Sequence, residues 1–303
     1  MGAADSVISK GAIKGQEKIP ISWMDAIILG LIAGCITWLL WKSAANLEYR
    51  WSWQSIPQYI FRFDAKTGIW VPGVLMSGII TTLRISIWAT LISLLIGTVM
   101  AIGRAGKNTF FKSVGTAYVG LIRNIPILVW LFISYYFIAD ALLPLMKLER
   151  LIHMDKGLMR STISLLTGPV SDLPLFISGT FALAVYEGAY ITEIIRAGIE
   201  DIEKGQWEAS SALGFNRFQQ MRHIILPQAF KTVLPPLAGQ MISIIKDSAI
   251  VSVISIPELT FQGMELMSAT FLTFEIWISI LVIYFLICFS CSLGISYIEK
   301  KLN

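Results

Sequence analysis

Charged side chains are scarce in this chain. Only 15% of its 303 residues are Asp, Glu, Lys or Arg, whereas about a quarter is usual in a soluble domain. The basic residues are scattered rather than gathered in a stripe, which argues against a nucleic-acid-binding surface. Hydrophobic residues make up 55% of the chain and form long runs without charge. The composition therefore excludes an ordinary soluble protein and indicates an integral membrane protein.

Cysteine is also scarce, and a nucleotide-binding loop is missing. Cys35, Cys288 and Cys291 all lie in apolar runs, and no His or further Cys completes a set of metal ligands. The nearest approach to a phosphate-binding P-loop, residues 101–108, lacks the first Gly and the final hydroxyl residue. We therefore expect no metal site, no cofactor held by this chain and no enzymatic activity of its own.

Six apolar runs approach the length of about 20 residues that a membrane helix needs. The second run is too long for one simple crossing, and we expect its start, WVPGVLMSG, to lie along the membrane interface. Trp41, Trp70 and Trp130 suit interfacial positions. The first run resembles a signal peptide, but the lysine-containing tail before it favours a retained helix over cleavage. The six runs are residues 24–41, 74–103, 126–143, 175–195, 234–254 and 276–295.

The distribution of Lys and Arg predicts the orientation. With the amino terminus in the cytoplasm, the inner side carries more basic residues than the outer side, most clearly in 104–123, which has no Asp or Glu. Both termini are then cytoplasmic. We expect residues 1–23 to form a cytoplasmic tail, 24–42 an extra transmembrane helix, 43–73 a periplasmic or interfacial connection and 74–303 the main transmembrane domain.

One polar segment interrupts this apolar chain, EKGQWEASSALGFNRFQQMRHIILP at residues 203–227. Good helix formers at 207–213 are followed by Gly214, which can adopt the left-handed turn that ends a helix. Asn216 can then cap a second helix over 217–225, and Pro227 is expected to end it. This pattern predicts two short helices on the cytoplasmic side.

The second of these helices is amphipathic. Phe218, Met221 and Ile225 share one face at helical spacing. Two interpretations follow from the residues alone. The segment either rests on lipid headgroups or docks a cytoplasmic partner.

The spacing of the segment resembles a family signature. Glu208-Ala209-Ser210, Gly214, Ile224 and Leu226-Pro227 resemble EAA-x3-G-x9-I-x-LP, the EAA signature of ABC importer permeases, with Ser210 where a second Ala is usual. From about Ser77 to Asn303 the chain is similar to permeases for polar amino acids, a family that takes up histidine, glutamate, glutamine, arginine and opines. The stretches that carry this resemblance are 78–104, 118–137, 189–210, 225–237 and the IIKDS of 244–248.

The resemblance implies an all-α integral membrane protein with a MetI-like core of five spans, as in type I ABC importers, plus one extra amino-terminal span. It implies a permease subunit of the bacterial inner membrane that moves polar amino acids into the cytoplasm. The implied partners are a second permease subunit, identical or different, two cytoplasmic ATPase subunits that bind ATP and Mg, and a periplasmic or lipid-anchored solute-binding protein. The residues implied to contact the ATPase are Gly205, Glu208, Ala209, Ser210, Gly214, Ile224, Leu226 and Pro227.

Several ionisable residues fall inside the expected spans. Glu187, Lys246, Asp247 and Arg84 lie there, and such residues usually face the bundle interior or a solute pathway. A buried Glu187 can meet the ammonium group of an amino acid, and a Lys or Arg its carboxylate. Alternatively, Glu187 or Asp247 only neutralises Lys246.

Two polar residues share a helix face with Asp247. Gln240, Ser243 and Asp247 are spaced at i, i+3 and i+7. This stripe either lines the pathway or forms hydrogen bonds to a neighbouring span. Glu193 and Arg196, three residues apart, are expected to pair with each other.

Three other functions remain open from the residues. An ion-coupled secondary transporter would usually show inverted repeats, and no internal repeat is evident. A membrane scaffold that binds an ATPase without transport is disfavoured by the ionisable residues within the spans. An importer permease for another small solute is the third alternative.

Overall fold

The computed structural model describes residues 23–46, 49–66, 68–106, 108–139, 141 and 157–302. The expected tail therefore lies outside the described residues, except for Trp23. The chain divides into two compact units, residues 1–51 and 52–303. Each unit is described by itself.

The first unit contains one helix. Helix α1, Trp23–Asn46, covers the range 24–42 that was expected to form an extra transmembrane helix. At 1.5 Å per residue, a helix of 24 residues is about 36 Å long, enough to cross a hydrocarbon layer of about 30 Å. Its continuous apolar part is shorter and ends at Leu39.

The second unit opens with a small folded connection. A 3-10 turn η1, Trp53–Ser55, leads to a single helical turn α2, Pro57–Ile60. Strand β1, Phe61–Asp64, then pairs with strand β2, Ile69–Pro72, in an antiparallel hairpin. The interfacial connection expected over 43–73 is thus partly built of regular structure.

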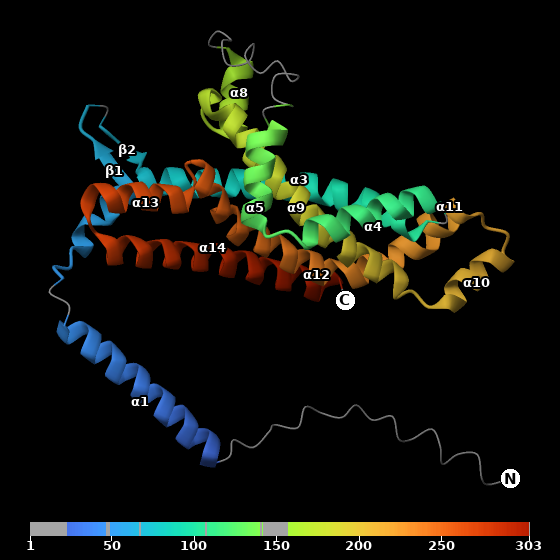
Figure 1. Ribbon diagram of the computed structural model, residues 1–303, viewed down its shortest axis with the longest axis horizontal. Coiled ribbons are helices and arrows are strands. Elements are labelled where there is room, and N and C mark those ends of the chain that lie inside the picture. The colour runs from blue at the N-terminus through green and yellow to red at the C-terminus, as the bar shows by residue number, and fades with distance from the viewer. Residues whose placement is uncertain are drawn as a thin grey trace. The chain divides into compact units, whose positions relative to one another are not determined.

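Four long helices make up the bulk of the second unit (Figure 1). They are α3, Val74–Ala105; α9, Leu173–Glu200; α12, Leu226–Asp247, which continues as the 3-10 segment η6, Ser248–Ile254; and α14, Thr273–Leu302. Each is long and apolar enough to cross a membrane. At the start of the second run, residues 70–72 are strand and α3 is one continuous helix from Val74.

The third expected span, 126–143, follows a sharp bend in the chain. Helix α5, Ile127–Ile133, begins at its predicted start and continues as the π-helical segment η2, Ser134–Ala139. The 109° bend lies before this span, between α5 and helix α4, Thr109–Arg123. The basic stretch 104–123 contains a helix that was not predicted, and it starts where Asn108 accepts a hydrogen bond from the Phe110 N–H at 2.9 Å. Counting the bent pair as one span gives five candidates among the described residues, so the expected number of six is not confirmed.

Three shorter elements were not anticipated from the sequence. They are helix α8, Leu158–Thr167, the 3-10 turn η4, Val170–Asp172, and helix α13, Leu259–Thr270. Helix α13 follows Ser255, a left-handed residue at φ 64°, and is capped by Glu258, whose Oε1 accepts the Phe261 N–H at 2.8 Å. The buried carboxylate also accepts hydrogen bonds from Tyr284 and Thr82, which ties α13 to α14 and α3.

The core of the bundle lies between α3 and α9. These two helices have the most extensive contact in the chain. At Gly97 they approach so closely that an added Cβ would overlap Ile191 of α9, whose own Cβ would be only 2.8 Å away. Trp130, expected at the membrane interface, is instead buried and donates its Nε1–H to the Ala182 carbonyl of α9 at 2.8 Å. A tryptophan needs such a partner when it is buried, and one sequence does not reveal it.

Candidate functional site

The polar segment 203–227 forms a helix–turn–helix at the end of the bundle opposite to the β-hairpin (Figure 1). Helix α10, Lys204–Ala212, is followed by Gly214 at φ +80°. The Phe215 N–H donates to the Ser210 carbonyl at 3.2 Å, and the Leu213 N–H to the Ala209 carbonyl at 3.1 Å. These bonds close the end of α10 around a left-handed residue, as predicted for Gly214.

Asn216 begins the second helix, as the sequence predicts. Its Oδ1 accepts the Gln219 N–H at 2.9 Å, and the Gln219 side chain accepts the Asn216 N–H at 2.9 Å. This reciprocal pair is a capping box. The helix it starts is short, α11, Arg217–Gln220.

Pro227 does not end this helix, contrary to the prediction. A π-helical segment η5, Met221–Ile225, leads directly into α12, and Pro227 lies in the first turn of α12. The Leu226 N–H donates to the Met221 carbonyl, one residue further back than in an α-helix. The wider turn makes room for the proline ring, so the chain continues as a helix where a proline would normally break it.

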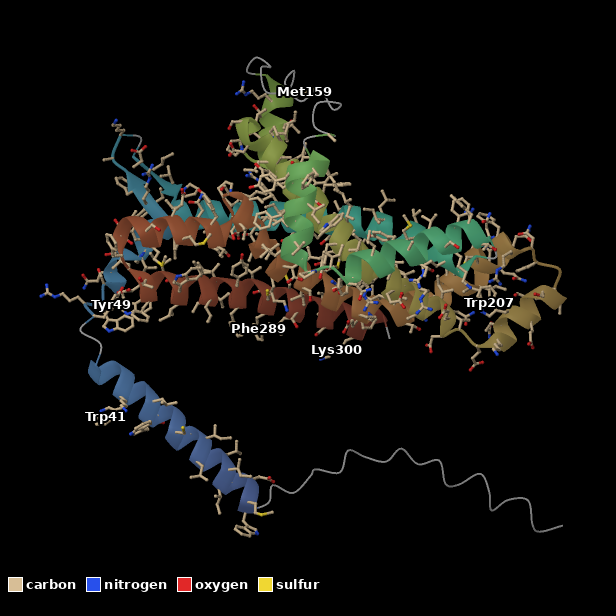
Figure 2. The ribbon with its side chains drawn as sticks, in the orientation of Figure 1. Trp41, Tyr49, Met159, Trp207, Phe289 and Lys300 are labelled. Carbon is tan, nitrogen blue, oxygen red and sulfur yellow. The ribbon has the colours of Figure 1, made fainter. Side chains whose placement is uncertain are left out.

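The segment is anchored to the bundle by its tryptophan. Trp207, which is labelled in Figure 2, packs against the main core. The Arg217 guanidinium lies over its ring at 3.8 Å from the centroid. Ser210 is fully buried, and its Oγ–H donates to the Trp207 carbonyl at 2.8 Å. Ser210 therefore satisfies its hydroxyl within α10, which explains why it fits where a second alanine is usual.

The rest of the segment is mostly open to its surroundings. Met221 and Ile225 pack against the core as expected, but Phe218 is 70% exposed, so the predicted apolar face is only partly buried. Ile224 and Leu226 pack at the edge of the core. The side chains left exposed on the segment include Glu208, Ala209, Leu213, Phe218 and Pro227, together with the backbone of Gly205 and Gly214.

A second polar site lies inside the bundle, between α9 and α12. Glu187 is 1% exposed, and the amide Nε2–H of Gln240 donates to its Oε2. The other oxygen of Glu187, Oε1, has no hydrogen-bond partner within the described residues. Leaving a buried acceptor unpaired costs free energy, so this oxygen is available to a ligand that carries a donor.

The structure brings some of the predicted substrate residues together and separates others. Asp247 is half-buried and close enough to Glu187 for the two carboxyl groups to interact. Lys246 is exposed, and no ion pair in the described part of the chain includes it. Lys246 lies close enough to Asp247 for a Coulombic interaction, so the alternative in which Asp247 neutralises Lys246 stays open. Ser243 is half-buried on the same helix, and the side chain of Arg84 is half-buried on α3.

A charged cluster joins α3 to the carboxyl-terminal end of α9. Arg196 pairs with Glu193, as predicted, and also with Glu200. The prediction missed Arg104 of α3, whose Nη1–H donates to Glu193 Oε2 at 2.7 Å. From the sequence, Arg104 was identified only as one of the basic residues expected on the inner side of the membrane. Nothing in one sequence shows that it faces Glu193.

Two tyrosines on α9, close in sequence to the buried Glu187, were also missed. The hydroxyls of Tyr186 and Tyr190 lie 3.1 Å apart, and the Arg123 guanidinium lies 5.1 Å from the Tyr190 ring centroid. The Tyr118 hydroxyl of α4 donates to the Val185 carbonyl at 2.6 Å. Tyrosines four residues apart beside an intramembrane glutamate are the sequence signal that pointed to this environment.

The helical bundle, the capped helix–turn–helix and the buried carboxylate define a membrane permease of the importer class. Residues 93–303 match the family described as "Binding-protein-dependent transport system inner membrane component", and the chain belongs to this family. It is 36% identical over 228 residues to the "Probable glutamine ABC transporter permease protein GlnM" of Bacillus subtilis (strain 168), covering 75% of this chain and 93% of that protein. It is 30% identical over 231 residues to the "Glutamate/aspartate import permease protein GltJ" of Escherichia coli (strain K12), covering 76% of this chain and 88% of that protein.

Solved structures give the same fold. The structure described as "Crystal structure of an amino acid ABC transporter with histidines" superposes with a TM-score of 0.64 at 31% identity, covering 84% of this chain and 100% of that chain. An inward-facing structure of the MetNI methionine ABC transporter superposes with a TM-score of 0.55 at 17% identity, which shows the MetI-like fold alone. The region expected to contain the permease core, 74–303, includes all of the family match.

Proposed function

We propose that this chain carries a polar amino acid across the bacterial inner membrane, and that a separate ATPase drives it through the segment 203–227. The named relatives act on glutamine or on glutamate and aspartate, and their similarity supports a substrate of this class. The observation that carries the proposal is the free Oε1 of the buried Glu187. An amino acid offers an ammonium group that matches such an acceptor.

In this proposal the substrate ammonium binds between Glu187 and Asp247. Gln240 holds Glu187 Oε2 and so directs Oε1 toward the ligand. Two carboxyl groups close together repel when both are ionised, and a cation between them relieves this repulsion. Ser243 and Lys246 flank the site from α12, where Lys246 is available to a substrate carboxylate because it has no ion pair within the described residues.

The ATPase subunits bind the exposed surface of α10 and α11. Glu208, Ala209 and Leu213 present this surface, while Trp207 and Ser210 fix it to the bundle. The ATPases supply nucleotide and Mg, and the permease works with a second permease subunit and a solute-binding protein. Both termini and this segment are cytoplasmic in this proposal, because that orientation gives the inner side the larger number of basic residues.

An uptake assay on Glu187→Gln tests the substrate site. The chain is reconstituted into vesicles with its ATPase and binding protein, and uptake of labelled glutamine, glutamate, aspartate, histidine and cystine is measured. A charge-assisted hydrogen bond contributes about 1.5–3 kcal/mol, so the half-saturating concentration of the transported amino acid should rise about ten- to hundredfold.

The matched control is Glu265→Gln, which makes the same chemical change at an exposed position on α13. It should leave uptake unchanged. Equal affinity and rate in the Glu187→Gln variant would remove Glu187 from the substrate site. Uptake of none of the amino acids by the unaltered complex would refute the substrate class.

A further inference from the structure

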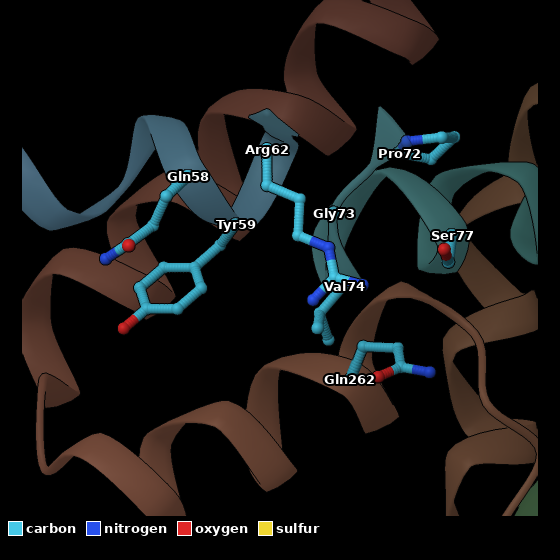
Figure 3. Close-up of a pocket in the computed structure, with 8 residues that line it drawn as sticks. All are labelled: Gln58, Tyr59, Arg62, Pro72, Gly73, Val74, Ser77 and Gln262. Carbon is cyan, nitrogen blue, oxygen red and sulfur yellow. The ribbon is translucent and has the colours of Figure 1, made fainter. Parts of the chain in front are cut away.

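A cleft of about 460 Å³ opens at the end of the second unit that carries the β-hairpin, where α2 and the hairpin meet the first turn of α3 (Figure 3). Neither the buried site nor the segment 203–227 includes it. Its lining consists of Gln58, Tyr59, Arg62, Pro72, Gly73, Val74, Ser77 and Gln262.

The walls of this cleft are held together by a glycine. The Gly73 N–H donates to the Ile60 carbonyl at 2.8 Å. A Cβ added to Gly73 would overlap the Tyr59 carbonyl group, with the carbonyl carbon only 2.5 Å away. Only glycine allows the backbone of α2 to approach α3 this closely, so the cleft is formed before any ligand binds.

The cleft carries hydrogen-bond donors and a positive charge but no carboxylate. Figure 3 shows the Arg62 side chain extending from β1 past Gly73 towards Gln262 of α13. The guanidinium of Arg62, the amides of Gln58 and Gln262 and the hydroxyls of Tyr59 and Ser77 make no side-chain hydrogen bond within the described residues. An arginine surrounded by neutral donors is suited to an anion with several oxygens, above all a phosphate group.

The surroundings of the cleft place it at the depth of lipid headgroups. Phe63 and Trp70 of the hairpin are more than half exposed and contact each other edge to face at 5.7 Å between ring centroids. Exposed aromatic residues of this kind gather at membrane interfaces. The hairpin also precedes α3 directly, where a helix long enough to cross the membrane begins.

An apolar groove of about 610 Å³ lies beside the same connection. Ile60 and Phe61 line this groove, whereas their neighbours Tyr59 and Arg62 line the polar cleft. One short stretch of chain thus separates a polar hollow from an apolar one. The groove is lined by Trp53, Ile56, Pro57, Ile60, Phe61 and Trp70 and, from α14, by Ile278, Ser279, Val282, Ile283 and Leu286.

We propose that these two hollows bind one phospholipid. Arg62 and its neighbouring donors hold the phosphate of the headgroup, and an acyl chain lies in the groove along α14. A free phosphate ion would use only the cleft, whereas a phospholipid matches both the charge of the cleft and the apolar lining of the groove. The bound lipid fastens the hairpin to α3 and α14 at the membrane surface.

Lipid titration of the detergent-solubilised full-length chain tests the proposal. Dioleoylphosphatidylglycerol is added, and the apparent dissociation constant of the first bound lipid is measured by native mass spectrometry. Arg62→Gln should weaken binding about tenfold, because a charge-assisted bond is replaced by a neutral one. Arg62→Lys, which keeps the charge, should restore part of the affinity. Val282→Asn should also weaken binding, since it places an amide in the groove.

The matched control is Lys66→Gln, which removes the same charge from the hairpin outside the cleft and should leave binding unchanged. Equal weakening by Lys66→Gln and Arg62→Gln would overturn the site in favour of diffuse attraction. Displacement of the lipid by millimolar inorganic phosphate would reassign the cleft to a free anion. If Arg62→Gln binds lipid normally but its ATP-driven uptake is no longer stimulated by the solute-binding protein, the cleft is a protein contact. This result too would overturn the proposal.

Discussion

Replacing Gly214 should loosen the turn between α10 and α11 without creating a clash. Gly214 has φ +80°, and a Cβ added there meets nothing within 4 Å. The only cost is therefore conformational. A left-handed backbone costs an ordinary residue about 1–2 kcal/mol, the cost is highest for a β-branched residue, and asparagine tolerates it best. Gly214→Val and Gly214→Asn therefore form a matched pair that differs mainly in the free-energy cost of the left-handed backbone.

Amide hydrogen exchange measures this difference directly. The N–H groups of Leu213 and Phe215 close the turn by donating to the Ala209 and Ser210 carbonyls. A change of about 1–2 kcal/mol corresponds to a factor of roughly 5–30 in the opening equilibrium. Both amides should exchange faster by about this factor in Gly214→Val than in Gly214→Asn.

The Asp201 N–H, which donates to the Ala197 carbonyl at the end of α9, serves as an internal reference and should not change. If the two variants exchange at equal rates at Leu213 and Phe215, the left-handed turn does not limit the stability of this segment. ATP-driven uptake should follow the same order, with Gly214→Asn close to the unaltered protein and Gly214→Val reduced. Full uptake by Gly214→Val despite faster amide exchange would show that ATP-driven transport does not depend on a well-ordered turn.

Two further predictions concern the partner surface and the packing of the bundle. Glu208→Lys should abolish ATP-driven uptake and leave membrane insertion intact, because it reverses the charge of an exposed residue on α10. The control Glu265→Lys, on α13, should transport normally. Equal uptake by the two variants would contradict ATPase docking at Glu208. Gly97→Ala should lower the free energy of unfolding by about 1–3 kcal/mol, because the added Cβ would overlap Ile191. The control Gly120→Ala, whose added Cβ meets nothing within 4 Å, should be neutral or stabilising. Thermal unfolding in detergent compares the two variants, and equal midpoints would show that α3 and α9 separate easily.

Features set by neighbouring residues could be predicted from the sequence. The apolar runs 175–195 and 276–295 lie within α9 and α14, which extend beyond these runs at both ends. The turn at Gly214 and the cap at Asn216 were also confirmed, since both depend on backbone preferences within four residues. Local rules of this kind hold because the chain supplies both partners of each hydrogen bond nearby.

Features that depend on how helices continue or bend were harder to predict. Pro227 was expected to stop a helix, but the π-helical turn before it allows α12 to proceed. The 109° bend between α4 and α5 follows Arg123, where Pro126 adopts an extended backbone. Hydropathy identified the apolar run that begins at 126, but it gave no sign of α4 or of the angle at which α4 meets α5.

Contacts between distant residues could not be predicted at all. Gln240 and Glu187 are 53 residues apart, and Arg104 and Glu193 are 89 apart. The sequence identified each as polar and intramembrane or near the membrane edge, but their pairing depends on the way in which α3, α9 and α12 pack. The candidate site was therefore predictable as a set of residues and not as an arrangement.

The chain order explains how the two sites can act on each other. The segment 203–227 connects the end of α9 to the start of α12, and the hydrogen bond between Glu187 and Gln240 joins the same two helices deeper in the bundle. Arg104 fixes α3 to α9 through Glu193 just before α9 leads into the segment. A force on α10 and α11 therefore reaches the buried carboxylate through both helices at once, while α3 moves with α9. If α9 and α12 shift relative to each other, the bond to Gln240 is strained or broken, and the direction of the free oxygen changes. In the proposed function, such a displacement of two packed helices would be the means by which the segment alters substrate affinity.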